Sequence, residues 1–265
     1  VCEEEIAPLV FCALYLLLVD KLSEAPRKRG TPHVADYLFK PAEVFALEVK
    51  GDAKLYPLRR IFCVGRNYAA HAAEMGNEVD REAPWYFTKQ VAHAVTSGAV
   101  LPYPPGTENY HQEMELAFVL GVSVFRASAT EAQAAIYAYG CALDMTRRDR
   151  QQDGKDNRRP WSLGKDVEGS AVLGSLTKAE AFGAVEDQRI YLEVNGVTRQ
   201  DASLKEMVWS CGEIVAHLSR YYHLGAGDII LTGTPAGVGP VVAGDSIRGG
   251  IEGLEGVSLT LGAAE

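Results

Sequence analysis

The sequence predicts an α+β fold in which strands dominate. Most apolar stretches are short, many are bounded by Gly, Pro or Asn-Gly, and few units alternate strand and helix as a doubly wound parallel sheet requires. At 265 residues and 47% hydrophobic content, the chain can bury a full core. We therefore expect one large, mostly β domain with a small appendage.

Residues 1–32 are expected to form an N-terminal extension with an apolar helix and a linker, and residues 33–265 the catalytic domain. The apolar run at residues 6–19 is shorter than the roughly 20 residues needed to cross a bilayer. Three acids, Glu3 to Glu5, precede it where a secretory signal carries basic residues. We therefore expect no membrane association, and a helix that is buried or packed on a partner.

Charge and cysteine content restrict the partners and the compartment. The net charge is −9 and no long basic tract is present, which argues against a nucleic-acid partner. The five cysteines are widely spaced and mostly lie among apolar neighbours, as buried free thiols do in a reducing compartment. We expect an intracellular protein, cytoplasmic or mitochondrial, without a disulfide or zinc.

The first half of the domain is expected to open with a buried strand at residues 60–65. An Ala-rich helix at residues 66–76 follows and ends at a glycine. Residues 85–89 read as a strand, and residues 100–105 as an extended segment limited by prolines.

The second half combines a central strand at residues 113–121, two helices and several short strands. The helices are expected at residues 130–140, capped by Thr130, and at residues 204–224. Asn195-Gly196 indicates a hairpin turn. The short strands are expected at residues 172–173, 190–194, 229–232 and 257–261.

Three carboxylates offer a site for one hard cation: Glu113, Glu115 and Asp144. On a strand, residues two apart face the same side with α-carbons about 6.6 Å apart, so both glutamates can reach one ion. Such a pair is often one solvated face of a sheet, but apolar residues continue on both faces of this strand, and buried carboxylates must be paired or coordinated. An oxygen-only set suits Mg²⁺, or alternatively Mn²⁺ or Ca²⁺.

Two further groups carry possible chemistry. Glu74 lies one helical turn after His71 and can orient its imidazole as a general base, although such a pair is also common on surfaces. The glycine-rich segment 231–239 follows a strand. Gly233, Gly237 and Gly239 permit close backbone approach, and the exposed N–H groups of the segment, with Thr234, could receive a carboxylate or phosphate. It lacks the ending of a P-loop, and a strained turn explains it equally well.

Basic and amide side chains follow the third acid. Arg147, Arg148, Gln151 and Lys165 could bind an anionic substrate if they lie near a metal site. Each of them alone is also compatible with a surface position.

Taken together, these motifs resemble those of the fumarylacetoacetate hydrolase family. The resemblance covers residues 57–247, and within the family several segments look most like the fumarylpyruvate hydrolases, or acylpyruvases. The family motifs are GRNYAAHAAE at residues 65–74, HQEMEL at 111–116, LDMTRRD at 143–149 and GDIILTGTPAGVGP at 227–240.

The resemblance implies a mixed β-sandwich roll, a homodimer, and a divalent ion held by Glu113, Glu115 and Asp144. It implies that His71, Glu74 and Lys165 are catalytic, the first two on a lid that orders when substrate binds. The substrate-binding residues implied are Arg66, Tyr68, Arg148, Gln151, Lys165, Gly233 and Thr234. The chain departs from the family after Lys165, where Asp166 and Glu168 bring two acids to a region expected to meet an anion.

The function expected on this basis is metal-dependent hydrolysis of a carbon–carbon bond in a 3-acylpyruvate such as fumarylpyruvate, within aromatic catabolism. Pyruvate and a carboxylic acid would be released from this small anionic keto acid. Two alternatives stay open: decarboxylation of oxaloacetate or another lyase or isomerase reaction of the same fold, and an inactive dimer that binds a ligand or partner.

Overall fold

The structure, a computed structural model, describes residues 37–76 and 82–264. Residues 37–43 form no helix or strand, and the compact unit described below begins at Val44. The expected extension at residues 1–32, with its apolar run, lies outside the described residues, so the division at residue 32 stays a prediction. No helix in the described ranges is long and apolar enough to cross a membrane.

A seven-stranded mixed sheet forms the centre of the unit. Its β3–β14 and β11–β5 pairs are parallel, and the other four pairs are antiparallel. In sheet order the strands are β4 (Tyr86–Lys89), β3 (Arg60–Val64), β14 (Asp228–Leu231), β8 (Met114–Leu120), β9 (Ile136–Asp144), β11 (Ala171–Lys178) and β5 (Ala94–Thr96).

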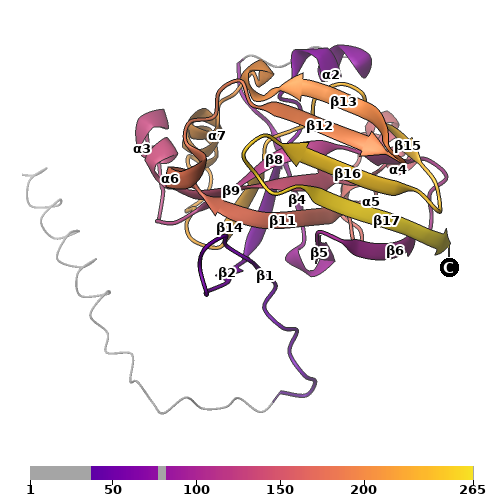
Figure 1. The fold of residues 1–265 in the computed structure, drawn as a ribbon, viewed down its shortest axis with the longest axis horizontal. Helices are drawn as coiled ribbons and strands as arrows, with labels where there is room; N and C mark the ends of the chain where they lie inside the picture. The colour runs from indigo at the N-terminus through magenta and orange to yellow at the C-terminus, as the bar shows by residue number, and fades with distance from the viewer. Residues whose placement is uncertain (1–36, 77–81, 265) are drawn as a thin grey trace, which may run out of the picture. The chain divides into compact units, whose positions relative to one another are not determined.

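A five-stranded sheet packs against one face of the seven-stranded sheet, and Figure 1 shows it as a layer in front of β8, β9 and β11. In sheet order its strands are β13 (Val197–Ser203), β12 (Arg189–Val194), β16 (Ser246–Ile251), β17 (Val257–Ala264) and β6 (Ala99–Tyr103). Met114, Leu116 and Phe118 of β8 share one core with Ile190 and Leu192 of β12. The architecture is the predicted mostly-β sandwich roll.

The other face of the seven-stranded sheet is covered as well. Ala117 and Val119 of β8 lie in a second core with Leu47 and Tyr56, from the two-stranded sheet β1 (Ala46–Leu47) and β2 (Tyr56–Pro57). Every residue of β8 is buried for this reason. A three-stranded sheet has the order β10 (Thr146–Arg147), β7 (Tyr110–Gln112) and β15 (Gly239–Val241).

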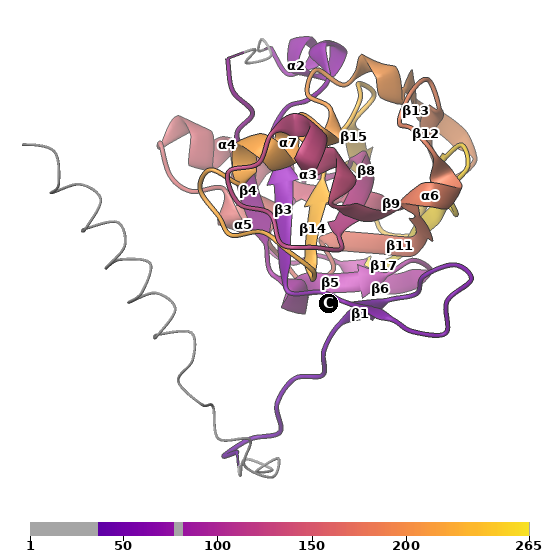
Figure 2. The same cartoon turned by 90° about the vertical axis from the view of Figure 1, so that its left-hand side faces the viewer.

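Short helices surround the sheets. They are α2 (Ala69–Glu74), α3 (Ala129–Ala134), α4 (Arg148–Asp156), α5 (Ser162–Lys165), α6 (Ala179–Phe182) and α7 (Cys211–Leu218), with 3₁₀ turns η1 (Val91–His93) and η2 (Leu204–Glu206). Helices α3 and α7 lie side by side, as Figure 2 shows. Gly212 permits this approach, because a Cβ there would lie 2.7 Å from the carbonyl oxygen of Ala129.

Most predicted elements are present. The expected strands all occur, and the helix at residues 66–76 is the shorter α2, which Gly76 follows with φ of +69°. Asn195 and Gly196 join β12 to β13 with φ of +53° and +76°, the left-handed values of a tight hairpin turn.

The two long helices were predicted wrongly. Helix α3 ends at Ala134, and residues 136–140 belong to β9, because Ile136 and Tyr139 pair with β8 and enter the core. Ser128, rather than Thr130, caps α3 through a reciprocal bond with Glu131. Residues 204–224 contain only η2 and α7, since the Ser210 side chain caps a new helix and interrupts the expected one.

Candidate active site

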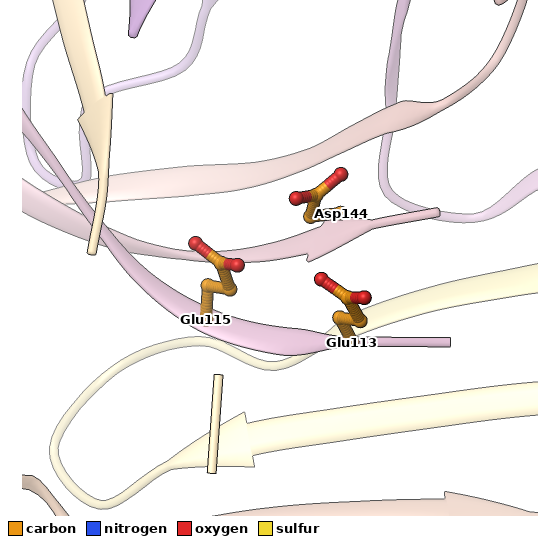
Figure 3. Close-up of side chains that lie close together, drawn as sticks. All are labelled: Glu113, Glu115 and Asp144. Carbon is orange, nitrogen blue, oxygen red and sulfur yellow. The ribbon is translucent and has the colours of Figure 1, made fainter. Parts of the chain in front are cut away.

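Three acids meet where β8 begins and β9 ends, and Figure 3 shows their carboxylates turned toward one another. The amide of Asp144 donates to the carbonyl of Glu113 at 2.9 Å, so these residues lie directly opposite on neighbouring strands, where side chains are close. Glu115 lies two residues along β8 on the same side. One carboxylate oxygen from each residue lies within 4.8 Å of the other two, and the three residues are at most 3% exposed.

The surroundings shift the pKa values of two of these acids, Glu115 and Glu113, in opposite directions. Burial, followed by the charges of Asp144 and Glu113, raises the pKa of Glu115 well above its usual value. Among the described residues, the carboxylate of Glu115 accepts one hydrogen bond, from the amide of Gly233 at 2.7 Å. Burial also acts to raise the pKa of Glu113, but Lys165 and Arg148 outweigh burial and lower it.

Three cations border the acids. Lys165 Nζ donates to Glu113 Oε2 at 2.7 Å and to Asp144 Oδ2 at 2.8 Å. Burial acts to lower the pKa of Lys165, but the two acids outweigh it and raise the pKa. Arg148 donates to the other Glu113 oxygen, and Lys89 Nζ lies 2.8 Å from Asp144 Oδ1. Three basic side chains therefore face the three acids.

The donor set fits a hard divalent cation. It consists of carboxylate oxygens alone, which suits Mg²⁺, Mn²⁺ or Ca²⁺ rather than a thiolate-binding metal. Asp144 Oδ1, although close to Lys89, accepts no well-aligned hydrogen bond from the described residues. A cation among these oxygens would offset the mutual repulsion that raises the pKa of Glu115.

The glycine-rich loop after β14 forms part of the site. Gly233 has φ of +91° and lies so close to Asn67 that a Cβ would be 3.0 Å from the Asn67 Cβ. Thr234 Oγ1 donates to the carbonyl of Met114 at 2.7 Å and accepts from Gln200. This hydroxyl anchors the loop to β8, and direct contact between Thr234 and substrate stays a prediction.

The predicted His71–Glu74 pair lies on α2 and contacts this loop. His71 is buried, with Nδ1 3.5 Å from Glu74 Oε2. Both Glu74 oxygens lie 3.1 Å from the amide of Gly237, which donates to them. Burial lowers the pKa of His71. Burial therefore favours the neutral imidazole, which lies within the electrostatic reach of Glu113 and Lys165.

Of the remaining residues predicted to bind substrate, two lie beside the acids and two lie in the segment just before α2. Arg148 and Gln151 are buried beside the acids, and Arg148 Nη1 donates to Gln151 Oε1 at 2.7 Å. Tyr68 precedes α2, and its buried hydroxyl has no hydrogen-bond partner among the described residues. Arg66 is half-buried over the ring of Trp85.

The two acids after Lys165 do not crowd its ammonium group. Asp166 Oδ1 accepts from the amide of Gln90 at 2.9 Å and lies 2.8 Å from His93 Nδ1. Glu168 is exposed. Lys165 therefore lies at the site despite the departure from the family pattern.

Sequence reasoning missed two groups that shape the site. Lys89 is buried at the end of β4 and also donates to the carbonyls of Met145 and Lys165. Thr146 Oγ1 lies 2.8 Å from Lys165 Nζ. A lysine that ends a buried strand is the signal that could have found Lys89, because such a charge needs a partner.

The sequence profile of the fumarylacetoacetate (FAA) hydrolase C-terminal domain matches residues 60–261. This chain belongs to that family. It is 49% identical over 193 residues to the fumarylpyruvate hydrolase of a Ralstonia species, covering 72% of this chain and all of the relative. The Escherichia coli oxaloacetate tautomerase is 37% identical over 193 residues, covering 72% of this chain and 88% of the relative.

A solved structure supports the same relationship within the family. The fumarylpyruvate hydrolase of Pseudomonas aeruginosa, in complex with Mn²⁺ and pyruvate, superposes with a TM-score of 0.82 at 39% identity. The match covers 86% of this chain and all of that one. The family resemblance and the fold predicted from the motifs are confirmed.

Proposed function

We propose that the protein is a divalent-metal-dependent hydrolase that cleaves a carbon–carbon bond in a 3-acylpyruvate, with fumarylpyruvate as the leading substrate. The products are pyruvate and the carboxylic acid of the acyl group. One observation carries the proposal: three acids converge, and one of them, Glu113, lies within electrostatic reach of His71, in a chain 49% identical to a fumarylpyruvate hydrolase.

Glu113, Glu115 and Asp144 would hold the cation, which would supply Lewis-acid stabilisation of the negative charge that develops on the substrate oxygens. Lys165 adds a fixed positive charge beside Glu113 and Asp144. Arg148 holds Glu113 in place and, with Gln151, lines the side of the site formed by α4. These groups orient the pyruvate end of the substrate.

Glu74 and His71 carry out the proton transfer from water. Glu74, acting through or beside the neutral His71, accepts a proton from water while the water oxygen attacks the acyl carbonyl. The carbon–carbon bond then breaks, its electron pair leaves on the pyruvate enolate, and a proton returned to the enolate carbon gives pyruvate. The contact with Gly237 sets the position of Glu74 relative to the glycine-rich loop.

Mg²⁺ is the metal we propose for this oxygen-only site, with Mn²⁺ able to replace it. We also propose a homodimer that works in aromatic catabolism in the cytoplasm or mitochondrion. Support for the reducing compartment comes from Cys63, Cys141 and Cys211, which are free and buried.

The second candidate is a reaction on oxaloacetate, because tautomerases of that acid are 35–37% identical to this chain. Tautomerisation moves a proton and decarboxylation breaks a different bond, and neither needs an attacking water. The His71–Glu74 pair can serve proton transfer in either case, so the reaction must be distinguished by assay.

One panel of assays tests the proposal. Fumarylpyruvate, acetylpyruvate and oxaloacetate are incubated with enzyme and Mg²⁺ or Mn²⁺, each with and without EDTA. We expect pyruvate release from the acylpyruvates that EDTA abolishes. Reaction of oxaloacetate alone would instead assign the second function, and no reaction with any substrate would indicate a non-catalytic relative.

A further inference from the structure

Two cations lie outside the acid cluster, each placed over an indole ring. Arg66 Cζ lies 5.7 Å from the centre of the Trp85 ring, and Lys155 Nζ lies 5.2 Å from the Trp161 ring. The two indoles meet edge to face, with centres 4.8 Å apart. Residues from three separate segments thus bring two positive charges onto one aromatic surface.

Glycines shape this surface. A Cβ at Gly65, the residue before Arg66, would overlap the Trp85 ring. A Cβ at Gly154, the residue before Lys155, would lie 3.3 Å from Trp161 Cδ1. Each indole therefore lies against backbone next to the cation that it carries.

The aromatic surface is continuous with the acid cluster. The Phe87 ring lies 6.5 Å from Trp161, and Lys165 Nζ lies 4.9 Å from the centre of Phe87. Along α4, Arg148, Gln151 and Lys155 are spaced three and four residues apart and share one face. Lys155 is thus about 10 Å farther along the helix axis than Arg148, which contacts Glu113.

The described part of the chain supplies no ion-paired acid to the two outer cations, Arg66 and Lys155. Neither Arg66 nor Lys155 forms an ion pair with a carboxylate among the described residues, although both are half-buried. Burial lowers the pKa of Lys155, and the charges of Arg148, Arg66 and Lys165 lower it further. Positive charges gathered without an ion-paired acid among the described residues favour an anionic ligand.

We propose that Arg66 and Lys155, carried on Trp85 and Trp161, bind the distal carboxylate of a dianionic acylpyruvate. The proposal rests on the proposed function and specifies its substrate class. The pyruvate end lies at the acid cluster, and a second carboxylate at the far end of the acyl group reaches the outer cations. An acyl group without a carboxylate leaves them unpaired.

The test compares two substrates that differ at the distal end. Fumarylpyruvate carries a carboxylate there, and acetylpyruvate ends in a methyl group. The variants are Arg66→Met and Lys155→Met, which keep an apolar stem on the indole and remove the charge. Lys50→Met, at an exposed lysine whose amide bonds to β11, is the matched control.

We expect each variant to lower kcat/KM for fumarylpyruvate by about tenfold or more, through KM, as loss of one charged hydrogen bond does. Acetylpyruvate turnover should change by less than about twofold, because it makes no use of these cations. Lys50→Met should alter neither value.

An equal loss for both substrates, or no loss for either, would overturn the distal subsite while leaving the hydrolase assignment intact. A wild-type enzyme that hydrolyses neither acylpyruvate would contradict the proposed function itself.

Discussion

Buried acids lie at both ends of the β8–β14 pair, Asp228 at one end and a group of three at the other, and the chain satisfies them in different ways. Asp228 begins β14 and accepts hydrogen bonds from Arg59, Arg60 and the amide of Gly225. At the other end, Glu115 receives one amide hydrogen bond and faces two more acids. The antiparallel register, which pairs Leu231 with Ala117, fixes this separation.

The difference separates a structural acid from a functional one. Asp228 has two arginines for one carboxylate, so its charge is neutralised by the fold. Burial and the neighbouring charges of Asp144 and Glu113 disfavour the charged form of Glu115, and a bound cation would remove that penalty. Replacing an acid by its amide should therefore harm activity at one end and stability at the other.

The largest effect is expected from Glu115→Gln. Losing a ligand to the cation should lower metal-dependent kcat/KM more than about 10³-fold, since several kcal/mol of charge stabilisation are lost. The free energy of unfolding without metal should not fall, because the amide relieves repulsion between acids. Steady-state assay and urea denaturation measure the two quantities.

The control is Asp187→Asn, which makes the same chemical change at an exposed acid. Full Mn²⁺ binding and turnover by Glu115→Gln would show that Glu115 is not a ligand of the metal.

Glu74→Gln should separate chemistry from metal binding. The amide cannot take a proton from water, so kcat should fall on the order of 10²- to 10³-fold, within the range for a positioned base. Mn²⁺ affinity, measured by calorimetry, should stay at the wild-type value because Glu74 is no ligand in this account. A matching loss of Mn²⁺ affinity would place Glu74 among the ligands.

Asp228→Asn should reverse the pattern seen at Glu115. It leaves Arg59 and Arg60 without their acid, and we expect a loss of about 2–3 kcal/mol in the free energy of unfolding. The loss stays moderate because the arginine side chains are 56% and 32% exposed and remain partly solvated. Turnover by the folded enzyme should be unchanged, and a large fall in kcat at full stability would contradict the structural role.

The smallest effect concerns pH. Burial lowers the pKa of His71 below the usual 6.5, so the neutral imidazole persists as pH falls through that value. The acidic limb of kcat/KM should therefore lie below pH 6.5, with activity lost as pH falls through the lowered pKa. Glu74→Gln should move the limb lower still, since the Glu74 contact acts to raise this pKa. An acidic limb above pH 6.5 would exclude His71 as its source.

Local patterns were enough to predict the acids, because Glu113 and Glu115 share a face by strand geometry alone. The position of Asp144 opposite Glu113 depends on strand register, which joins residues 31 apart in the chain and leaves no local signal. The same limit explains the error at residues 136–140, whose strand state depends on pairing with β8. It also hid Lys89, whose partners Asp144 and Met145 come from a distant segment.

The departure after Lys165 shows the same dependence on tertiary context. The sequence predicted that Asp166 brings a negative charge next to the anion site. In the structure its carboxylate is bound by Gln90 and His93, from a segment more than 70 residues earlier. The number of acidic residues near Lys165 in the sequence therefore predicted the charge around it poorly. The contacts that each side chain makes in the fold determine that charge.

Anomalous diffraction from a crystal soaked with Mn²⁺ tests the central claim most directly. We expect one anomalous peak among Glu113, Glu115 and Asp144, with an oxygen of each in the coordination sphere, and its loss in the Glu115→Gln variant. A peak elsewhere, or none while Lys165 keeps its bonds to Glu113 and Asp144, would contradict the account.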